Sequence, residues 1–430
     1  MLALGGCDVN TWLGGREAPP LPGERISILS LQQQLEPDPR IQDLQVRLPR
    51  PYANDSWPQR GGYAGHAMHH LKLADNPAEV WRSGVGEGSG RVQRLITSPV
   101  VAGGRLFVFD TEASVAAIDA ATGRRLWRIN LTPEHEDEGT VGGGVAYDAG
   151  RLFVTTGYGE VVAVDPETGA VDWSYDVSGP IRAAPTVAAG RVFAVSFDNQ
   201  LHVLAAADGR LLWSHVGIAE PAALLGAASP AVEGDLVIVP YSSGEVFALR
   251  VENGRVAWFD SLSAARASTS TLASLSDING EPVIDRGRVL VISHSGRMVA
   301  LDLTSGRQLW DQTIGGVETP WVAGDFIYVV TIEGSLLCLS REDGRIRWVT
   351  ELPRFADEEA REEPITWAGP VLVSDRLVLA SSHGFALAVS PYTGRVLGRM
   401  SLPATAAAAP IVANETLYFL TEDAEVVALR

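Results

Sequence analysis

The chain has 430 residues, with 52 acidic and 34 basic side chains and a formal net charge of −18. Hydrophobic residues make up 46% of it, which is enough for a large core and excludes a wholly disordered chain. The acidic balance argues against a nucleic-acid-binding protein, which would carry basic patches. The 44 Gly and 25 Pro residues favour many turns and short elements over long helices.

The N-terminal residues Leu4-Gly5-Gly6-Cys7 resemble a bacterial lipobox, in which small residues precede a cysteine that receives lipid. The resemblance implies that residues 1–7 are a signal remnant, that Cys7 is lipidated and that the chain is anchored to a membrane. A plain terminal cysteine is the alternative, because only six residues precede Cys7. Asp8 leaves open whether the outer or the inner membrane holds the anchor. No later stretch reaches the ~18 apolar residues of a transmembrane helix.

A repeat runs through the rest of the chain. The unit Asp119-Ala-Ala-Thr-Gly-Arg-Arg-Leu-Trp127 has a Thr-Gly turn between two short strands, in which Gly supplies the positive φ of a tight hairpin. Two further strands precede each turn, so each unit predicts a four-stranded antiparallel blade. Later copies end at or near Trp173, Trp213, Trp258, Trp310 and Trp348, and a seventh has Gly398 instead of Trp.

Eight segments open such units, near Ser98, Gly144, Ala184, Ser229, Glu281, Pro320, Gly369 and Ala409. The last unit ends at Leu429 without its outer strand, and Glu79–Arg82 has the pattern of the missing piece. The sequence therefore predicts an all-β fold, an eight-bladed β-propeller over residues 76–430, closed by an N-terminal strand that removes the open edge. Residues 8–75 are expected to be a partly disordered extension.

The regular tryptophans are interpreted as packing anchors between blades, since a ligand site would place aromatic residues on one rim. Several other residues receive a structural interpretation. His66, His69 and His70 form a weak candidate metal cluster, His294 and His383 are expected in turns, and Cys338 in a buried strand. The acidic stretches 134–138 and 357–363 are expected to be solvated loops, with charge-steered contacts as the alternative.

The Asp-x-x-Thr-Gly-x-x-x-Trp unit resembles the repeat of quinoprotein-type eight-bladed propellers, a group that includes PQQ-dependent dehydrogenases and non-enzymatic relatives. Dehydrogenases of this type carry long insertions and calcium ligands, and the alcohol-oxidising ones add a vicinal disulfide. This chain has short blades and only two cysteines. It more closely resembles the BamB family, lipoproteins of the outer-membrane β-barrel assembly machinery. That resemblance implies no catalytic residue, cofactor or metal.

Two segments match loops that, in that family, dock the barrel-insertase subunit. Leu275–Asn279 resembles a Leu-Ser-Asp-x-Asp loop, with Asn279 in place of the second Asp. Ala222–Gly226 lies where the family has Leu-x-Leu-Arg-Gly, with Leu225 in place of Arg. The resemblance implies a partner-binding site at Leu224, Leu225, Asp277 and Asn279.

Two classes of function remain open at this point. The first is a non-enzymatic periplasmic scaffold, tethered at Cys7, that binds the insertase subunit and nascent outer-membrane proteins. The second is a PQQ-dependent periplasmic dehydrogenase. A generic protein-binding propeller differs from the first only in its partner. Bound quinone with substrate oxidation would favour the dehydrogenase.

Overall fold

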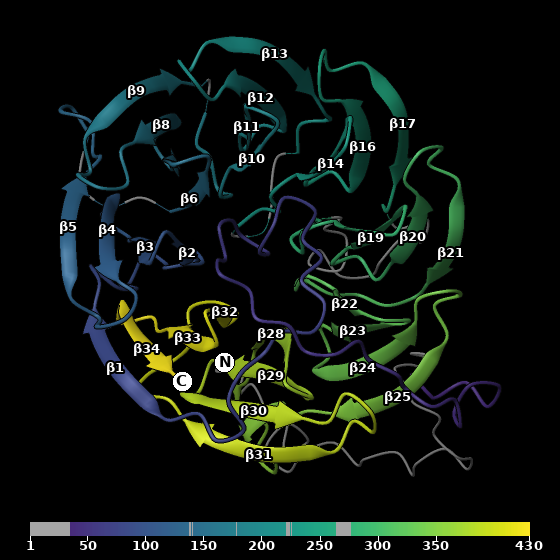
Figure 1. The fold of residues 1–430 in the computed structure, drawn as a ribbon. Helices are drawn as coiled ribbons and strands as arrows, with labels where there is room; N and C mark the ends of the chain where they lie inside the picture. The colour runs from purple at the N-terminus through teal and green to yellow at the C-terminus, as the bar shows by residue number, and fades with distance from the viewer. Residues whose placement is uncertain are drawn as a thin grey trace, which may run out of the picture. The chain divides into compact units, whose positions relative to one another are not determined.

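Eight antiparallel sheets, each of four strands, are arranged around a ring (Figure 1). The computed structural model describes residues 35–136, 139, 141–177, 179–220, 224, 226–263 and 277–430. Contacts divide the chain into Met1–Leu35, of which only Leu35 is described, and Glu36–Arg430, which contains the ring. The predicted eight-bladed propeller is confirmed, and the described residues form strands, turns and loops without an α-helix.

Blades 1 to 4 follow one another along the chain, with the innermost strand first in each. Blade 1 contains β2 (Val100–Ala102), β3 (Arg105–Phe109), β4 (Ser114–Asp119) and β5 (Arg125–Asn130). Blade 2 contains β6 (Gly143–Asp148), β7 (Arg151–Thr156), β8 (Glu160–Val164) and β9 (Val171–Asp176). Blade 3 contains β10 (Thr186–Ala188), β11 (Arg191–Val195), β12 (Gln200–Ala205) and β13 (Leu211–Val216). Blade 4 contains β14 (Ala231–Glu233), β15 (Leu236–Pro240), β16 (Glu245–Arg250) and β17 (Val256–Ser261).

Blades 5 to 7 repeat this order, and a hairpin is inserted before blade 7. Blade 5 contains β18 (Val283–Asp285), β19 (Arg288–Ile292), β20 (Met298–Asp302) and β21 (Gln308–Gln312). Blade 6 contains β22 (Trp321–Ala323), β23 (Phe326–Val330), β24 (Ser335–Ser340) and β25 (Ile346–Glu351). The hairpin pairs β26 (Phe355–Asp357) with β27 (Glu362–Pro364). Blade 7 contains β28 (Trp367–Val373), β29 (Arg376–Ser381), β30 (Phe385–Val389) and β31 (Val396–Ser401).

Blade 8 closes the ring with strands from both ends of the propeller. Its inner strands are β32 (Ile411–Ala413), β33 (Thr416–Leu420) and β34 (Glu425–Leu429), and its outer strand is β1 (Glu79–Gly84). β1 runs antiparallel to β34, with Arg82 opposite Val427 and Gly84 opposite Glu425. The predicted closing strand is therefore confirmed, and it covers an edge of β34 that would otherwise be free to pair with another chain.

The tryptophans join each blade to the next, as predicted. In the outer strands of seven blades, the indole N–H of one tryptophan donates to a backbone carbonyl of the following blade, and its ring lies against the glycine of that blade's Thr-Gly-type turn. A Cβ added to Gly209, for example, would come within 2.5 Å of the Trp173 ring. The pairs of donor and acceptor residues are Trp81–Ala120, Trp127–Pro166, Trp173–Ala206, Trp213–Val251, Trp258–Leu303, Trp310–Arg341 and Trp348–Pro391.

The joint between blades 7 and 8 is different, and the reason lies in the closure. Because β34 and β1 come from opposite ends of the propeller, no hairpin turn connects them. An indole at position 398 would have no turn glycine on which to pack, and a Cβ added to Gly398 would have no described atom within 4 Å. The missing tryptophan of the seventh repeat thus follows from the way in which the ring closes.

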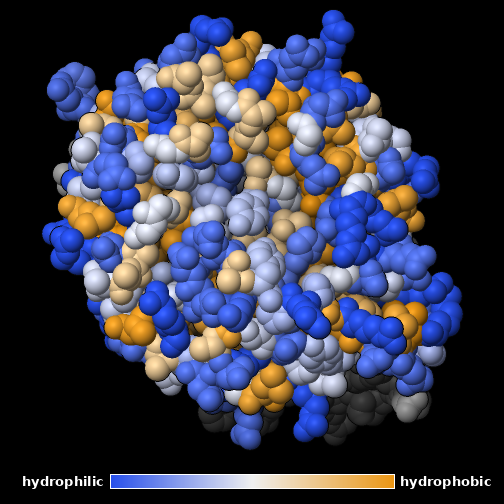
Figure 2. Space-filling view, viewed as in Figure 1, coloured by the Kyte–Doolittle hydropathy of each residue, from blue (hydrophilic) through white to orange (hydrophobic). Residues whose placement is uncertain are grey.

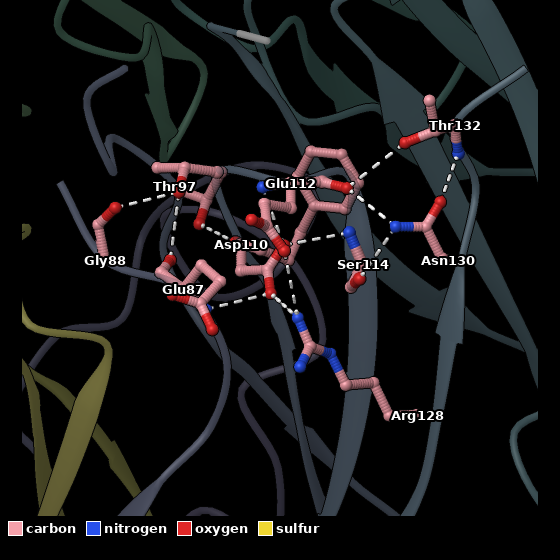
Figure 3. A network of polar contacts seen from close by, with 11 residues as sticks. Glu87, Gly88, Thr97, Asp110, Glu112, Ser114, Arg128, Asn130 and Thr132 are labelled. Atoms are coloured by element: carbon pink, nitrogen blue, oxygen red, sulfur yellow. Dashed lines mark hydrogen bonds and ion pairs between the residues drawn. The ribbon is translucent and has the colours of Figure 1, made fainter. Parts of the chain in front are cut away.

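A buried carboxylate holds the chain that leaves the closing strand against blade 1 (Figure 3). Asp110 follows β3, and its side chain accepts hydrogen bonds from the backbone N–H groups of Glu87, Glu112 and Ser114. Arg128, in the outer strand of the same blade, donates to Asp110 Oδ2 at 2.8 Å. These contacts satisfy a carboxylate that is 3% exposed and join the link after β1 to blade 1.

The segment before β1 fills the centre of the ring (Figure 1). We call residues 54–71 the central segment, because they contact the innermost strand of every blade. The contacts follow the order of the blades, from blade 8 through blade 1 to blade 7: Asn54 with Val412, Trp57 with Val101, Pro58 with Tyr147, Gln59 with Val187, Ala64 with Val232, Gly65 with Ile284, His69 with Trp321, and Leu71 with Leu372 and Val373.

Most of these contacts use backbone atoms of the central segment. Val232 N donates to Ala64 O at 2.7 Å, and Ile284 N donates to Gly65 O at 2.8 Å. Trp57 and Leu71 are buried in the core formed by the last blades and blade 1. In the space-filling view, side chains fill the middle of the ring (Figure 2). Residues 54–71 of the expected extension are thus packed into the propeller.

Candidate functional site

Two linkers between blades carry the predicted partner-binding residues. Residues 217–230 connect blades 3 and 4, and residues 262–282 connect blades 4 and 5. The structure brings the two linkers together, because Leu224 N donates a hydrogen bond to Asp277 Oδ2 at 3.0 Å. Leu225 and residues 264–276 lie outside the described residues.

Asp277 is buried, with 2% of its surface exposed. Burial raises the pKa of its carboxyl group, and the hydrogen bond from Leu224 N acts in the opposite direction. The same residue anchors blade 5, because its carbonyl accepts from His294 N at 2.9 Å. The buried Asp277 side chain therefore connects the two linkers. Asn279 lies two residues further on, is half-buried and lines two neighbouring cavities.

Leu224 is half-buried and lines a cavity of about 400 Å³. The opposite wall comes from blades 6 and 7 and the hairpin between them, and includes Ile332, Phe355, Ile365 and Trp367. The linker between blades 3 and 4 thus reaches the far side of the ring. Ile332 is 46% exposed, so the rim of this cavity presents apolar surface to solvent.

Arg60 of the central segment supports both linkers. Its Nε lies 2.5 Å from Glu281 Oε1, and its Nη1 donates to Ala227 O at 3.0 Å. Ala227 belongs to the linker that carries Leu224, and Glu281 to the one that carries Asp277. The Glu281 side chain is 4% exposed, so Arg60 neutralises a carboxylate that water does not reach.

A second cavity, of about 250 Å³, lies where the linkers enter the innermost strands, and we call it the central cavity. The central segment contributes Trp57, Arg60 and His66 to its lining. Glu281 comes from the linker between blades 4 and 5, and Glu318 from the link between blades 5 and 6. The surrounding protein raises the pKa of Glu318 to about 7, mainly by burial, and Glu281 adds to this effect. Burial lowers the pKa of His66.

The other residues singled out in the sequence have structural positions. His66 and His70 contact the carbonyls of Pro282 and Pro49, and no group of three or more metal-ligating side chains occurs within the described ranges. His294 and His383 lie in turns, and Cys338 is buried in β24, as predicted. Residues 357–363 lie in the exposed β26–β27 hairpin. Cys7 lies outside the described residues.

Arg60 and Glu318 were not among the residues predicted from the sequence. Arg60 lies 221 residues before its partner Glu281, and no local pattern signals a pair of that separation. Glu318 is one of many acidic residues in inter-blade links. The available signal was Gln59-Arg60-Gly61-Gly62, a polar and glycine-rich stretch within the supposed extension, which is compatible with a tight turn against other backbone.

Comparison with known proteins agrees with this architecture. Residues 69–137 and 111–350, together more than half of the chain, match the family model described as outer membrane protein assembly factor BamB. The chain belongs to the BamB family. It is 28% identical over 360 residues to the outer membrane protein assembly factor BamB of Yersinia pestis, covering 82% of this chain and 88% of that protein.

Two solved structures show the same fold. BamB from Moraxella catarrhalis aligns with a TM-score of 0.70 at 17% identity, over 83% of this chain and 100% of that one. Quinohemoprotein alcohol dehydrogenase from Comamonas testosteroni aligns with a TM-score of 0.66 at 14% identity, over 87% of this chain and 80% of that one. At these identities the similarity establishes the propeller, and function has to be argued from the site.

The residues of the central cavity do not fit a quinone cofactor such as PQQ, which carries several carboxylates. Glu281 and Glu318 line the cavity, and Arg60 is already paired with Glu281. A polyanionic ligand would therefore have to approach two carboxyl groups without an available cation in the described lining. The part of the chain that the structure describes contains no helix with the length and apolar character needed to cross a bilayer.

Proposed function

We propose that this protein is a non-enzymatic scaffold of the outer-membrane β-barrel assembly machinery and that it binds the barrel-insertase subunit through the linkers carrying Leu224, Leu225, Asp277 and Asn279. Membership of the BamB family supports the assembly role. The hydrogen bond between Leu224 and Asp277 is the observation that carries the proposed site, since it unites the two segments that resemble the docking loops of that family.

The two residues have different roles in this proposal. Leu224 supplies apolar surface beside the cavity shared with Ile332 and Phe355, and an apolar anchor in such a groove is typical of interface centres. Asp277 is a positioning residue, because its buried carboxylate holds the backbone of the Leu224 linker. Asn279, next to the central cavity, extends this surface toward the middle of the ring.

The location follows from the same proposal. We place the propeller in the periplasm, anchored by lipid at Cys7 to the outer membrane, with retention in the inner membrane as the alternative. Metabolic labelling with a fatty acid tests this directly. The full-length protein should incorporate label and fractionate with outer membranes, and a Cys7→Ser variant should do neither. Unlabelled protein in the soluble fraction would contradict the anchor.

Two experiments test the function. Affinity purification from native membranes in mild detergent should recover the insertase subunit, and nascent outer-membrane proteins in substoichiometric amounts. Incubation of the purified protein with PQQ and calcium should give no stoichiometric cofactor spectrum and no dye-linked oxidation of alcohols or sugars. Stoichiometric binding of quinone together with substrate oxidation would contradict the scaffold function and favour the dehydrogenase.

A further inference from the structure

We propose that the central cavity binds the guanidinium group of an arginine side chain presented by a protein that docks on the linkers. The inference rests on the proposed function only for the source of that side chain. The chemistry of the cavity itself is independent of it. Three features of the described lining favour this ligand: an acceptor without a hydrogen-bond partner, a carboxyl group without a paired cation, and aromatic walls.

The unpaired acceptor is His66 Nε2. His66 is 4% exposed, and its Nδ1 lies 2.7 Å from Pro282 O, which can only accept a hydrogen bond. Nδ1 therefore carries the proton, and in the neutral ring Nε2 is left as an acceptor. Burial favours this neutral form. Among the described residues Nε2 has no hydrogen-bond partner, and a buried acceptor of this kind is stabilised by a ligand that donates a hydrogen bond.

The carboxyl group without a cation is Glu318. Its Oε2 accepts a hydrogen bond from Gly369 N at 2.9 Å, and its side chain is partly accessible within the cavity. The pKa of about 7 shows that this environment disfavours the carboxylate unless a positive charge is close by. Arg60 cannot provide that charge in full, because Glu281 and Ala227 already occupy its guanidinium. A cationic ligand would lower the pKa of Glu318 and so favour its ionised form.

The aromatic walls favour a planar cation. Trp57 and Trp321 both line the cavity and stack on each other, with ring centroids 6.2 Å apart and an interplanar angle of 19°. A guanidinium packs well on indole faces and can donate to two acceptors at once, whereas an ammonium group is a compact, strongly hydrated charge. The cavity volume of about 250 Å³ limits the ligand to a single side chain.

The test uses a small probe, N-acetyl-arginine-N-methylamide, with the full-length protein. Titration followed by tryptophan fluorescence should be saturable. The pKa of the Glu318 carboxyl, followed by carbon NMR, should fall when the probe is bound. The citrulline analogue has the same shape without the charge, and it should bind at least about tenfold more weakly because its hydrogen bonds are not charge-assisted.

Two variants locate the site. Glu318→Gln should weaken binding of the probe at least about tenfold. Glu342→Gln, a matched change at an exposed residue in the turn between β24 and β25, should leave binding unchanged. Binding that is unaffected by Glu318→Gln, equal binding of the citrulline or lysine analogue, or no saturable binding would overturn the proposal. None of these results depends on co-purification with the insertase, so the two proposals can fail separately.

Discussion

Trp81 Nε1 donates a hydrogen bond to the carbonyl of Ala120 at 3.2 Å, so the closing strand attaches to blade 1 by the same contact that joins the other tryptophan-bearing blades. The ring of Trp81 also packs on Gly123 and lies 5.8 Å from the ring of Tyr418. Trp81, 42 positions before Gly123, thus completes the circle of joints between blades. The stability of the whole ring should depend on this indole.

We expect Trp81→Ala to reduce the free energy of unfolding by about 3–5 kcal/mol, because it removes a buried indole and leaves a cavity. Trp81 is 8% exposed, whereas Val80 on the other face of the same strand is 48% exposed. Val80→Ala is therefore the matched control and should unfold close to the native protein in urea. Equal destabilisation by the two changes would mean that the contact of Trp81 with blade 1 adds no particular stability to the ring.

Truncation separates the central segment from the closing strand. Removal of residues 1–50 should leave a ring that melts close to the full chain, since the contacts of residues 54–71 with all eight inner strands survive. Removal of residues 1–75 should lower the melting temperature by deleting those contacts. Removal of residues 1–85 should lower it further and cause aggregation, because β34 then has an open edge. Identical melting of the first two truncations would show that the central segment adds no stability.

The stability of the protein should depend on pH through Glu318. Its pKa rises from 4.5 in the unfolded reference to about 7 in the folded protein, with Glu281 and Arg60 as its charged neighbours. Between these pH values the unfolded chain has released a proton that the folded protein keeps, so the free energy of unfolding falls as pH rises. The total loss is at most about 3.4 kcal/mol, and it is complete above the folded pKa.

The measurement compares urea unfolding of the native protein and the Glu318→Gln variant at about pH 5 and about pH 8. Subtracting the free energies of unfolding of the two proteins at each pH removes the contributions of the other titrating groups, which both proteins share. We expect the variant to gain stability relative to the native protein at the higher pH. A difference that does not change with pH would show that Glu318 has an ordinary pKa.

Arg60 should be essential for the arrangement of the linkers. Arg60→Ala leaves the buried carboxylate of Glu281 without its cation, and we expect a loss of about 3–5 kcal/mol. The double change Arg60→Ala with Glu281→Ala should recover part of this loss, because no buried charge then remains. Hydrogen exchange at residues 224–230 should be faster in both variants. Unchanged exchange in the double variant would show that Arg60 does not hold that linker.

The propeller could be predicted because its joints repeat. Six units combine a turn glycine with a tryptophan a few residues later, and a seventh keeps the turn glycine, so the pattern is visible in a single sequence. The closing strand could be identified because the eighth unit lacked its outer strand and the sequence Glu79–Arg82 around Trp81 matches the outer strands of the other units. The structure explains why Gly398 replaces the tryptophan: β34 and β1 of blade 8 are not joined by a hairpin turn, so an indole would have no turn glycine to contact.

The central segment could not be predicted on the same grounds. Pro58, Ala64, Gly65 and His69 contact the inner strands through their carbonyl oxygens, and backbone acceptors impose no side-chain pattern. Asp277 shows the same limit at the site. The resemblance of its segment to a docking loop was visible in the sequence. Its burial and its hydrogen bond to Leu224, 53 residues earlier in the chain, depend on how the two linkers fold together.

The most direct test of the proposed function is co-purification of the insertase subunit with variants of the two linkers. Leu224→Glu places a charge on the apolar wall, Asp277→Ala removes the acceptor that positions the linker, and Asp277→Asn keeps an acceptor. Val256→Glu, at a 50% exposed position on the outer strand of blade 4, is the control. We predict that Leu224→Glu and Asp277→Ala lose the insertase, that Asp277→Asn and Val256→Glu retain it, and that Leu224→Glu melts like the native protein. Retention of the insertase by a folded Leu224→Glu variant would contradict the account and place the interface elsewhere on the ring.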